Sequence, residues 1–221
     1  MEGYHFTLAG TPLIALGTGA LVWPEKRLLC VSDLHLGKSD RVIRRGGPIL
    51  PPYEVRDTLM RLDSDILSSQ AETIVCLGDS FDDLEAGKSL RDEELLWIRK
   101  LQVGRRWIWI EGNHDPGPLD MGGTHLKTLS LTPLSFRHIP LPCECGEIAG
   151  HFHPKVKLKL QGLFISKPCF LLDRDRLILP AYGTFTGGLK TQSGELSSLM
   201  RPGALAILTG KKVKAIPMPR V

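Results

Sequence analysis

The sequence contains no apolar run close to the roughly 18 residues that a membrane-spanning helix requires. Its first residues, MEGYHFTLAG, have no basic segment followed by an apolar stretch, which argues against a signal peptide. The five cysteines are an odd number without regular spacing, so they indicate no disulfide framework. These absences predict a cytoplasmic protein with reduced thiols and no association with a membrane.

Neither sign of charge dominates, because 28 Lys and Arg residues face 24 Asp and Glu residues for a net charge of +4. This mildly basic balance permits an anionic partner such as nucleic acid without requiring one. The content of 42% apolar and 24% charged residues is ordinary for a globular domain and excludes wholesale disorder. No repeat, low-complexity tract or Pro/Ser-rich linker divides the chain, so we expect one domain over residues 1–221.

Short apolar runs alternate with longer amphipathic ones in the first half of the chain. An N-terminal hairpin is predicted from the runs at 13–16 and 21–23, followed by buried strands at 28–31, 73–77 and 106–110. Helical spacing of apolar residues predicts helices over 53–69 and 89–101, with Ser89 capping the second. Beyond Pro133 the runs are strand-like, at 134–139, 147–150, 169–172, 177–181, 205–208 and 213–216. The pattern predicts a layered α/β sandwich with a mixed sheet in its second half.

Four of the predicted strands end in polar clusters. These clusters are Ser32-Asp33-Leu34-His35, Gly78-Asp79, Gly112-Asn113-His114-Asp115 and Gly150-His151-Phe152-His153. Ligands of open α/β sheets bind outside the carboxyl ends of the strands, so we expect the clusters to converge on one face. Five of the seven histidines lie in or between them: His35, His114, His138, His151 and His153.

The residue types in these clusters are those that bind divalent cations. Asp-x-His and His-x-His would place two side chains on the same side of an extended backbone, where each pair can hold an ion. Carboxylate, imidazole and amide oxygen suit Mn²⁺, Fe or Zn²⁺, and no cysteine belongs to the set. The candidate ligands outnumber the three or four that one catalytic zinc takes, and they are Asp33, His35, Asp79, Asn113, His138, His151 and His153.

Two ions about 3.5–4 Å apart stabilise the attacking and leaving oxygens of a displacement at phosphorus and lower the pKa of a bound water to about 7. The residues themselves therefore predict a two-metal phosphoesterase. His138 has no local motif, and the alternative is that it is an ordinary strand histidine.

The order of these motifs resembles the signature of calcineurin-like metallophosphoesterases. The resemblance implies an αββα sandwich of mixed β-sheets and two metals. It places Asp33, His35, Asp79 and His153 around the first metal, and Asp79, Asn113, His138 and His151 around the second. It also implies that His114 protonates the leaving oxygen or neutralises the phosphoryl charge, with Asp115 or a neighbour orienting it.

Three longer strings resemble a bacterial branch, the ligase-associated DNA damage response endonucleases. They are SDLHLGKSDRVIRRGGPILPPYE at 32–54, GHFHP at 150–154 and LPAYGTFTGG at 179–188. This resemblance implies Mn²⁺-dependent phosphodiester cleavage in DNA, a link to DNA repair, and a functional association with an ATP-dependent DNA ligase and a helicase. Two alternatives stay open: a small nucleotide or phosphomonoester as substrate, and a catalytically silent scaffold on the same fold.

Further side chains near the motifs are candidate phosphate contacts. The basic residues Lys38, Arg41, Arg44 and Arg45 follow the first motif directly, and a solvated face is the alternative for them. Thr184 and Thr186 could line a substrate groove, with a simple turn as the alternative. Between them, Phe185 could stack on a base.

Overall fold

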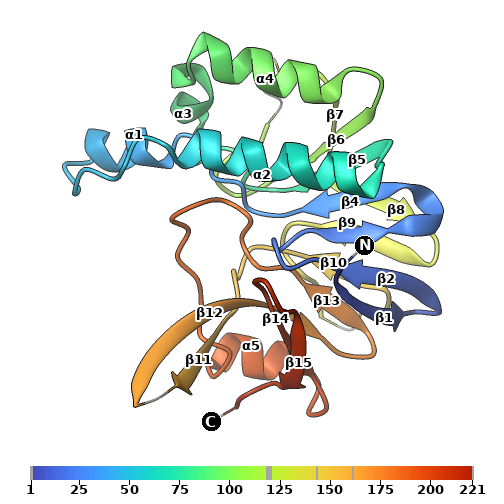
Figure 1. The fold of residues 1–221 in the computed structure, drawn as a ribbon. Helices are drawn as coiled ribbons and strands as arrows, with labels where there is room; N and C mark the ends of the chain where they lie inside the picture. The colour runs from blue at the N-terminus through green and yellow to red at the C-terminus, as the bar shows by residue number, and fades with distance from the viewer. Residues whose placement is uncertain (1, 118–120, 143, 161, 221) are drawn as a thin grey trace.

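Two mixed β-sheets packed face to face form the centre of the computed structural model, which describes residues 2–117, 121–142, 144–160 and 162–220. Helices cover the outer face of each sheet, which gives four layers (Figure 1). The predicted αββα sandwich of mixed sheets is therefore confirmed.

The first sheet has seven strands in the described residues, and they follow one another in chain order. They are β1 (Tyr4–Leu8), β2 (Thr11–Ala15), β3 (Leu21–Trp23), β4 (Leu28–Val31), β5 (Thr73–Leu77), β6 (Arg106–Ile110) and β7 (Thr124–Leu126). The first three pairs are antiparallel, whereas β4 to β7 run parallel. The short turn η1 (Pro24–Lys26) joins β3 to β4. The parallel arrangement brings the carboxyl ends of β4, β5 and β6 to one edge.

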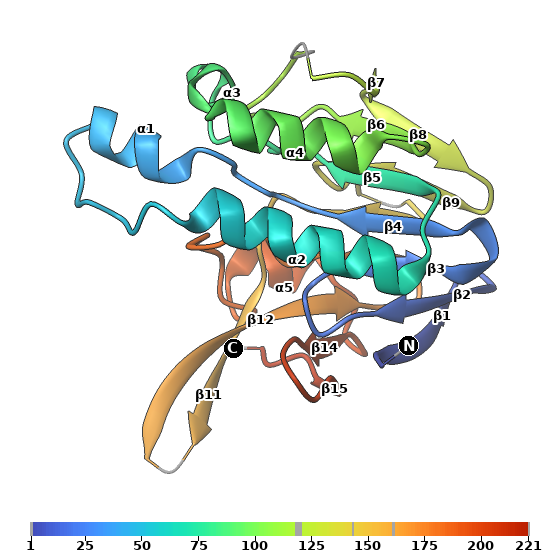
Figure 2. The same cartoon turned by 45° about the horizontal axis from the view of Figure 1, so that its top comes forward.

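Helices α2 (Glu54–Ser69) and α4 (Asp92–Gln102) cover the outer face of this sheet (Figure 2), and α1 (Lys38–Arg44) and α3 (Leu84–Ser89) precede them. The apolar stripe predicted over 53–69 lies on α2 and is buried at Val55, Leu59 and Ile66. The helix predicted from residue 89 begins at Asp92 instead. The physical reason is that Leu90 and Arg91 have extended backbone, so Ser89 ends α3 rather than capping α4.

The second sheet holds the strands of the C-terminal half in the order β15-β14-β12-β13-β10-β9-β8. Their bounds are β8 (Thr128–Leu131), β9 (Leu134–Arg137), β10 (Glu147–Ala149), β12 (Leu163–Leu172), β13 (Arg176–Ile178), β14 (Leu205–Leu208) and β15 (Lys214–Pro217). β10 is parallel to both β9 and β13. Helix α5 (Gly194–Leu199) packs on the outer face through Leu196.

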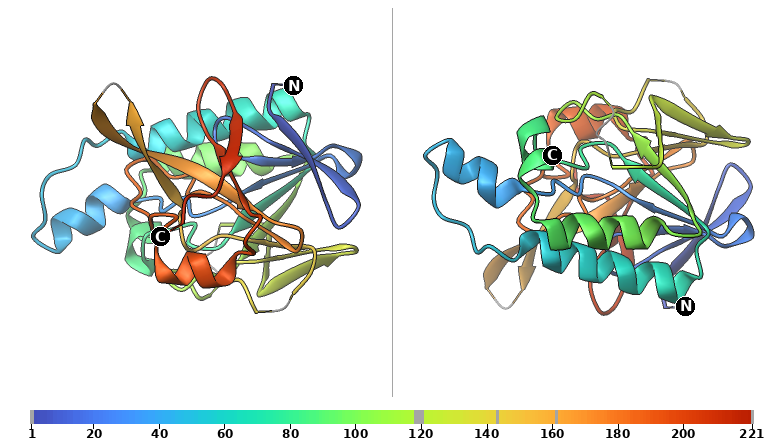
Figure 3. Two further views of the ribbon diagram at one scale, coloured as in Figure 1. Left: turned by 90° about the horizontal axis from the view of Figure 1, so that it is seen from below. Right: turned by 90° about the horizontal axis from the view of Figure 1, so that it is seen from above.

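A two-stranded arm leaves the body of the molecule. It consists of β11 (Lys155–Leu160) and the first half of β12, paired antiparallel. The arm projects beyond the sheets at the same end of the molecule as α1 (Figure 3). The arm was not predicted, although the alternation of lysine with apolar residues at 155–160 is typical of a half-buried strand.

Three apolar clusters hold the layers together. One lies between the helices and the first sheet, one between the two sheets, and one between the second sheet and α5. Trp107 and Trp109 belong to the first cluster and are almost fully buried. No helix in the described part of the chain combines the length and apolarity needed to cross a membrane.

Candidate metal centre

The predicted ligands all lie in loops that follow parallel strands. Asp33 and His35 follow β4, Asp79 follows β5, and Asn113 follows β6 of the first sheet. The second sheet contributes His138 after β9, and His151 and His153 after β10. The structure brings all of these side chains into one connected cluster between the ends of the two sheets.

Three side chains form the first group of this cluster. His153 Nε2 lies 2.9 Å from Asp33 Oδ1 and 3.5 Å from His35 Nε2. The other ring nitrogen of His35, Nδ1, lies 2.9 Å from Asp82 Oδ1. Because a carboxylate only accepts, Nδ1 of His35 carries the proton and Nε2 keeps its lone pair directed at the group.

The second group surrounds His138 Nε2. The Nδ1 atom of His138 lies 3.0 Å from the Leu77 carbonyl, which can only accept, so Nε2 is the unprotonated nitrogen of the neutral ring. Around Nε2 lie Asn113 Oδ1 at 3.0 Å, Asp79 Oδ2 at 3.3 Å and His151 Nδ1 at 3.3 Å. One proton cannot form hydrogen bonds with all of these atoms at once, whereas a metal cation can be coordinated by all of them. The donor set therefore fits a divalent metal.

Without a cation, the carboxylates draw a proton onto the cluster. Burial opposes a charge on His138, but the hydrogen bond to Asp79 and the charges of Asp33 and Asp79 outweigh it and raise the pKa of His138 to about 9. Burial likewise disfavours the charged forms of Asp33 and Asp79, yet their histidine partners lower the pKa of both carboxyls. The negative charge of the cluster thus needs a positive partner.

The ligand-bearing loops have left-handed backbone, which corrects one expectation. The sequence patterns predict an extended backbone through Asp-x-His and His-x-His. Instead φ is +55° at Asp33, +44° at His35, +44° at Asp79, +69° at His151 and +47° at His153. Each of these residues follows the end of its strand, where the chain turns sharply. A left-handed L-residue costs roughly 1–2 kcal/mol, and such strain concentrates at functional sites.

Two glycines allow these loops to approach one another. A Cβ on Gly78, whose φ is +73°, would lie 2.3 Å from His138 Nδ1. A Cβ on Gly112 would lie 2.1 Å from the Asp79 backbone nitrogen. Both separations are well inside van der Waals contact, so no side chain fits at either position.

His114 lies at the edge of the cluster, with about a third of its side chain exposed. Its Nδ1 lies 2.9 Å from the Asp82 carbonyl oxygen, and its Nε2 lies 3.9 Å from Asp79 Oδ2. Nδ1 therefore donates to the carbonyl, and Nε2 is the nitrogen on the side of the candidate ligands.

The resemblance implies that Asp115 or a neighbour orients His114, but the hydrogen bonds of the Asp115 side chain do not involve the His114 ring. Its carboxylate accepts from the backbone N–H groups of Ser80, Phe81 and Gly112 at 2.8, 3.2 and 3.1 Å. Burial raises the pKa of Asp115 to about 6 despite these bonds. Asp115 braces the loops after β5 and β6, and the neighbour that orients His114 is Asp82.

Sequence reasoning missed Asp82. Its side chain is 1% exposed and touches His35, Arg41 at 2.7 Å and Lys38 at 3.6 Å. Although burial opposes ionisation, the hydrogen bond from His35 and the two cations lower the pKa of Asp82 to about 2. The sequence offered one signal for Asp82, its place three residues after the candidate ligand Asp79. The adjacent Asp83 lies almost as close in sequence but does not contact His35, so the sequence alone does not tell the two apart.

The basic residues after the first motif divide into two kinds. Lys38 and Arg41 reach the site, and the Arg41 guanidinium lies 3.4 Å from His114 Nδ1. Arg44 instead pairs with Asp83 and Asp40, and Arg45 is exposed at the end of α1. The structure thus brings two of the four to the candidate site.

The two threonines also differ. Thr184 is engaged with α2, because its hydroxyl donates to Asp57 at 2.5 Å and accepts from Arg61 at 2.8 Å. Thr186 lines a cavity, and its carbonyl accepts from Lys155 Nζ at 2.8 Å.

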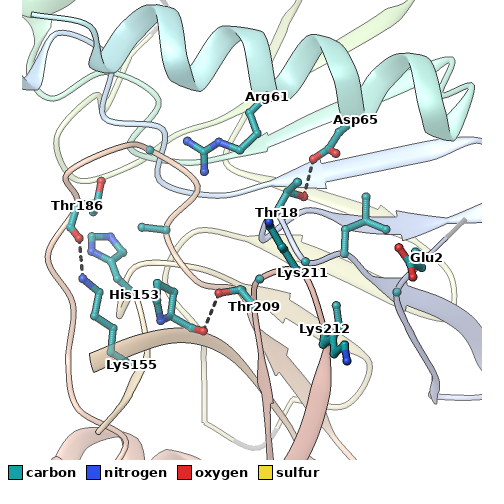
Figure 4. A pocket seen from close by; sticks show the side chains of 18 of the residues that line it. Glu2, Thr18, Arg61, Asp65, His153, Lys155, Thr186, Thr209, Lys211 and Lys212 are labelled. Carbon is teal, nitrogen blue, oxygen red and sulfur yellow. Dashed lines mark hydrogen bonds between the residues drawn. The ribbon is translucent and has the colours of Figure 1, made fainter. Parts of the chain in front are cut away.

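That cavity has a volume of about 1020 Å³ and adjoins His153 (Figure 4). His153, Lys155 and Thr186 lie together at one end of it, and Lys211 and Lys212 lie away from them. Its charged lining is Arg61, Lys155, Lys211 and Lys212 against Glu2 and Asp65. Asp65 already accepts from Thr18 and Tyr182, so the lining is basic on balance.

Among solved structures, one is similar to this chain over nearly its whole length. A Pseudomonas putida nuclease, MPE, superposes with a TM-score of 0.77 and 26% sequence identity, over 97% of this chain and 100% of that one. YfcE, a phosphoesterase from Escherichia coli, is 13% identical with a TM-score of 0.41, over 87% of this chain and 99% of that one. No curated protein sequence matches the chain.

The family description "calcineurin-like phosphoesterase" matches residues 26–189, which include every candidate ligand. The family consists of metal-dependent hydrolases, and the clustered side chains offer such a metal its ligands. The chain belongs to the calcineurin-like phosphoesterases.

Proposed function

We propose that this protein is a two-metal phosphodiesterase that cleaves DNA. The observation that carries the proposal is that the cluster contains two adjacent groups of possible metal ligands. In one group Asn113, Asp79 and His151 surround His138 Nε2. The other group is Asp33, His35 and His153. In this proposal Asp33, His35, Asp79 and His153 hold one metal, and Asp79, Asn113, His138 and His151 hold the other.

Two divalent cations here would stabilise the charge that develops on the phosphoryl oxygens and make a water molecule acidic enough to attack phosphorus at neutral pH. The protein itself holds two of the proposed ligands in position before a metal binds. The Leu77 carbonyl and the Asp82 carboxylate hold the Nδ1 atoms of His138 and His35, so the Nε2 atoms of both rings face inward before any metal binds.

His114 is proposed as the general acid. During hydrolysis, a bond forms between the water oxygen and phosphorus, and the ester bond to the leaving oxygen breaks. The leaving oxygen takes a proton from Nε2 of protonated His114, while Nδ1–H stays bonded to the Asp82 carbonyl. Arg41 lies beside this ring, where it can attract the phosphate of the substrate.

The choice of DNA is supported by charge and by likeness. The cavity that adjoins His153 has a basic lining and lies at the upper end of the size range of small-ligand sites, roughly 300–1,000 Å³. The similar Pseudomonas putida protein is itself a nuclease. The resemblance of the motif strings supports the finer proposals: Mn²⁺ as the metal, a role in DNA repair, and an ATP-dependent ligase and a helicase as functional partners.

The test is hydrolysis by the Mn²⁺-loaded protein of labelled single-stranded, gapped and duplex DNA. A chromogenic phosphodiester and a phosphomonoester are assayed with the same preparation, and His114→Ala is the control. Loss of both DNA and diester cleavage in His114→Ala supports the proposal. Hydrolysis of the small esters with every DNA left intact would retain the metal chemistry and overturn the DNA substrate.

A further inference from the structure

The arm formed by β11 and the first half of β12 has no role in the proposed chemistry. Beyond a bridge from Lys155 to Lys190, the strand pairing described for β11 is with β12, and Lys157, Lys159 and residues 162–166 near the tip are exposed. Three apolar side chains near the tip are strongly exposed: Leu163 at 71%, Phe164 at 63% and Ile165 at 40%. Exposure of this kind is costly unless a partner uses it.

The two faces of the arm differ in chemistry. Directly opposed residues of paired strands share a face, and Lys159 is opposite Phe164. Lys155 and Lys157 share that face, because side chains alternate along a strand. The opposite face carries Val156 and Leu158, which pack toward the core beneath α5. Nearer the tip it carries the exposed Leu163 and Ile165. That face is thus anchored to the body at its base, and the other face is a row of lysines with one aromatic ring.

Spacing and contacts on the basic face suit a nucleic acid strand. Alternate residues of a strand lie about 6.7 Å apart, which is comparable to the separation of neighbouring phosphates in an extended strand. The ammonium groups of Lys157 and Lys159 lie 4.1 and 5.9 Å from the centre of the Phe164 ring. An aromatic ring that is open to solvent and lies near two ammonium groups offers a stacking surface beside phosphate-binding groups.

The row of lysines begins at the metal centre. Lys155 is two residues after the candidate ligand His153, and both line the same cavity. Lys155 Nζ donates to the Thr186 carbonyl at 2.8 Å, at the end of the cavity where His153 lies (Figure 4). A strand whose phosphate sits at the metals can therefore continue along the arm without crossing the molecule (Figure 3).

We propose that the β11–β12 arm is a nucleic-acid-binding element. Lys155, Lys157 and Lys159 bind successive phosphates of one strand that leads away from the metal centre, and Phe164 stacks on an unpaired base of that strand. This inference rests on the proposed function, since it assigns the path of the same DNA substrate.

Protection of an exposed edge strand is the other use of such lysines. That use does not account for the arm, because a protected edge would not place the exposed Phe164 ring beside the charges. A base stacked on Phe164 gives the exposed ring a partner.

The test compares the double variant Lys157→Gln/Lys159→Gln with the control Arg99→Gln/Lys100→Gln. The control removes the same charge from the exposed last turn of α4. Binding of a fluorescent single-stranded oligonucleotide is followed in a His114→Ala background across a range of salt concentrations. Metal content and hydrolysis of a small phosphodiester, measured with His114 intact, establish that the arm variants fold.

Loss of two phosphate contacts should weaken binding about tenfold at moderate salt. It should also reduce the slope of log affinity against log salt by about 1.4. Phe164→Ala should weaken binding of the normal oligonucleotide roughly tenfold and leave binding of a fully abasic one unchanged. The lysine variant should weaken binding of both.

Equal behaviour of the arm and control variants would overturn the inference while leaving DNA cleavage, and so the proposed function, intact. Equal losses for Phe164→Ala on both oligonucleotides would overturn the stacking role. If the parent hydrolyses small diesters but neither binds nor cleaves DNA, the proposed substrate fails, and the inference fails with it.

Discussion

At the scale of single residues, the chemistry of the site depends on which nitrogen of each histidine carries its proton. His35 and His138 use Nδ1 for partners that only accept, namely the Asp82 carboxylate and the Leu77 carbonyl. His114 uses Nδ1 in the same way, for the carbonyl of Asp82. Asp82 thus sets two of the three rings, although it is not among the candidate ligands.

Asp82→Asn should weaken metal binding about 10- to 100-fold, because a neutral amide is a weaker acceptor than a carboxylate and orients the His35 ring less firmly. Competition against a fluorescent chelator measures this affinity. Asp83→Asn is the matched control, since Asp83 pairs with Arg44 and caps α3 instead. Equal affinities in the two variants would contradict the role given to Asp82.

His114→Ala should lower kcat by about 10²- to 10⁴-fold, as expected for loss of a general acid. Its metal content should not change, since its Nε2 lies outside the two candidate metal groups. Single-turnover kinetics and elemental analysis measure the two quantities. The exposed His5→Ala serves as control, and loss of metal from His114→Ala alone would make His114 a ligand.

Metal binding should release protons in a pH-dependent way. The pKa of His138 in the metal-free protein is raised to about 9, so His138 is protonated at neutral pH and a metal must displace that proton. The apparent affinity for Mn²⁺ should therefore rise with pH until about pH 9. Calorimetry in buffers of different ionisation enthalpy counts the protons released, and zero release at pH 7 would contradict this account.

At the scale of elements, the candidate ligands lie in the loops that follow the strands, and the close packing of these loops leaves no room for a side chain at Gly78. Gly78→Ala should destabilise the protein and abolish metal binding, because its Cβ would collide with the His138 ring. Gly46→Ala is the control, since φ is +71° there and no atom lies within 4 Å of its Cβ. The control should lose only about 1 kcal/mol of stability, measured by denaturant unfolding. Similar losses in both would exclude the close approach as the cause.

The sequence predicted the strands that are buried on both faces, because each is a compact apolar run such as 28–31 or 73–77. It also predicted which side chains gather, because each ligand directly follows such a run. It did not predict the left-handed backbone at Asp33 or His151, which is imposed by tertiary packing around the turn. The arm was missed although it has a local signal, the alternation of lysine with apolar residues at 155–160. The partners of Asp82 come from distant segments, so no local pattern indicates them.

At the scale of the whole molecule, the candidate ligands come from both sheets of the sandwich. Asp33 and Asp79 follow strands of the first sheet, and His138 and His153 follow strands of the second. Metals at this centre would therefore join the two layers at one end. Binding energy released only in the folded state adds to its stability.

Saturating Mn²⁺ should raise Tm by roughly 10–20 °C over the chelator-treated protein, as expected for two metals, each at about 100 times its Kd, and a chain of this size. Scanning calorimetry measures the shift. Asp79→Ala should reduce it, because Asp79 is the ligand proposed to be shared by both metals. An unchanged shift in that variant would contradict the sharing.

The central claim is that this chain holds two metals in the assigned places. Anomalous diffraction from crystals of the Mn²⁺-loaded protein tests it most directly. The account predicts two peaks about 3.5–4 Å apart. One should lie among Asp33, His35 and His153, and the other among Asp79, His138 and His151. A single peak, or a peak within the alternative cluster of His35, Asp82 and His114, would contradict it.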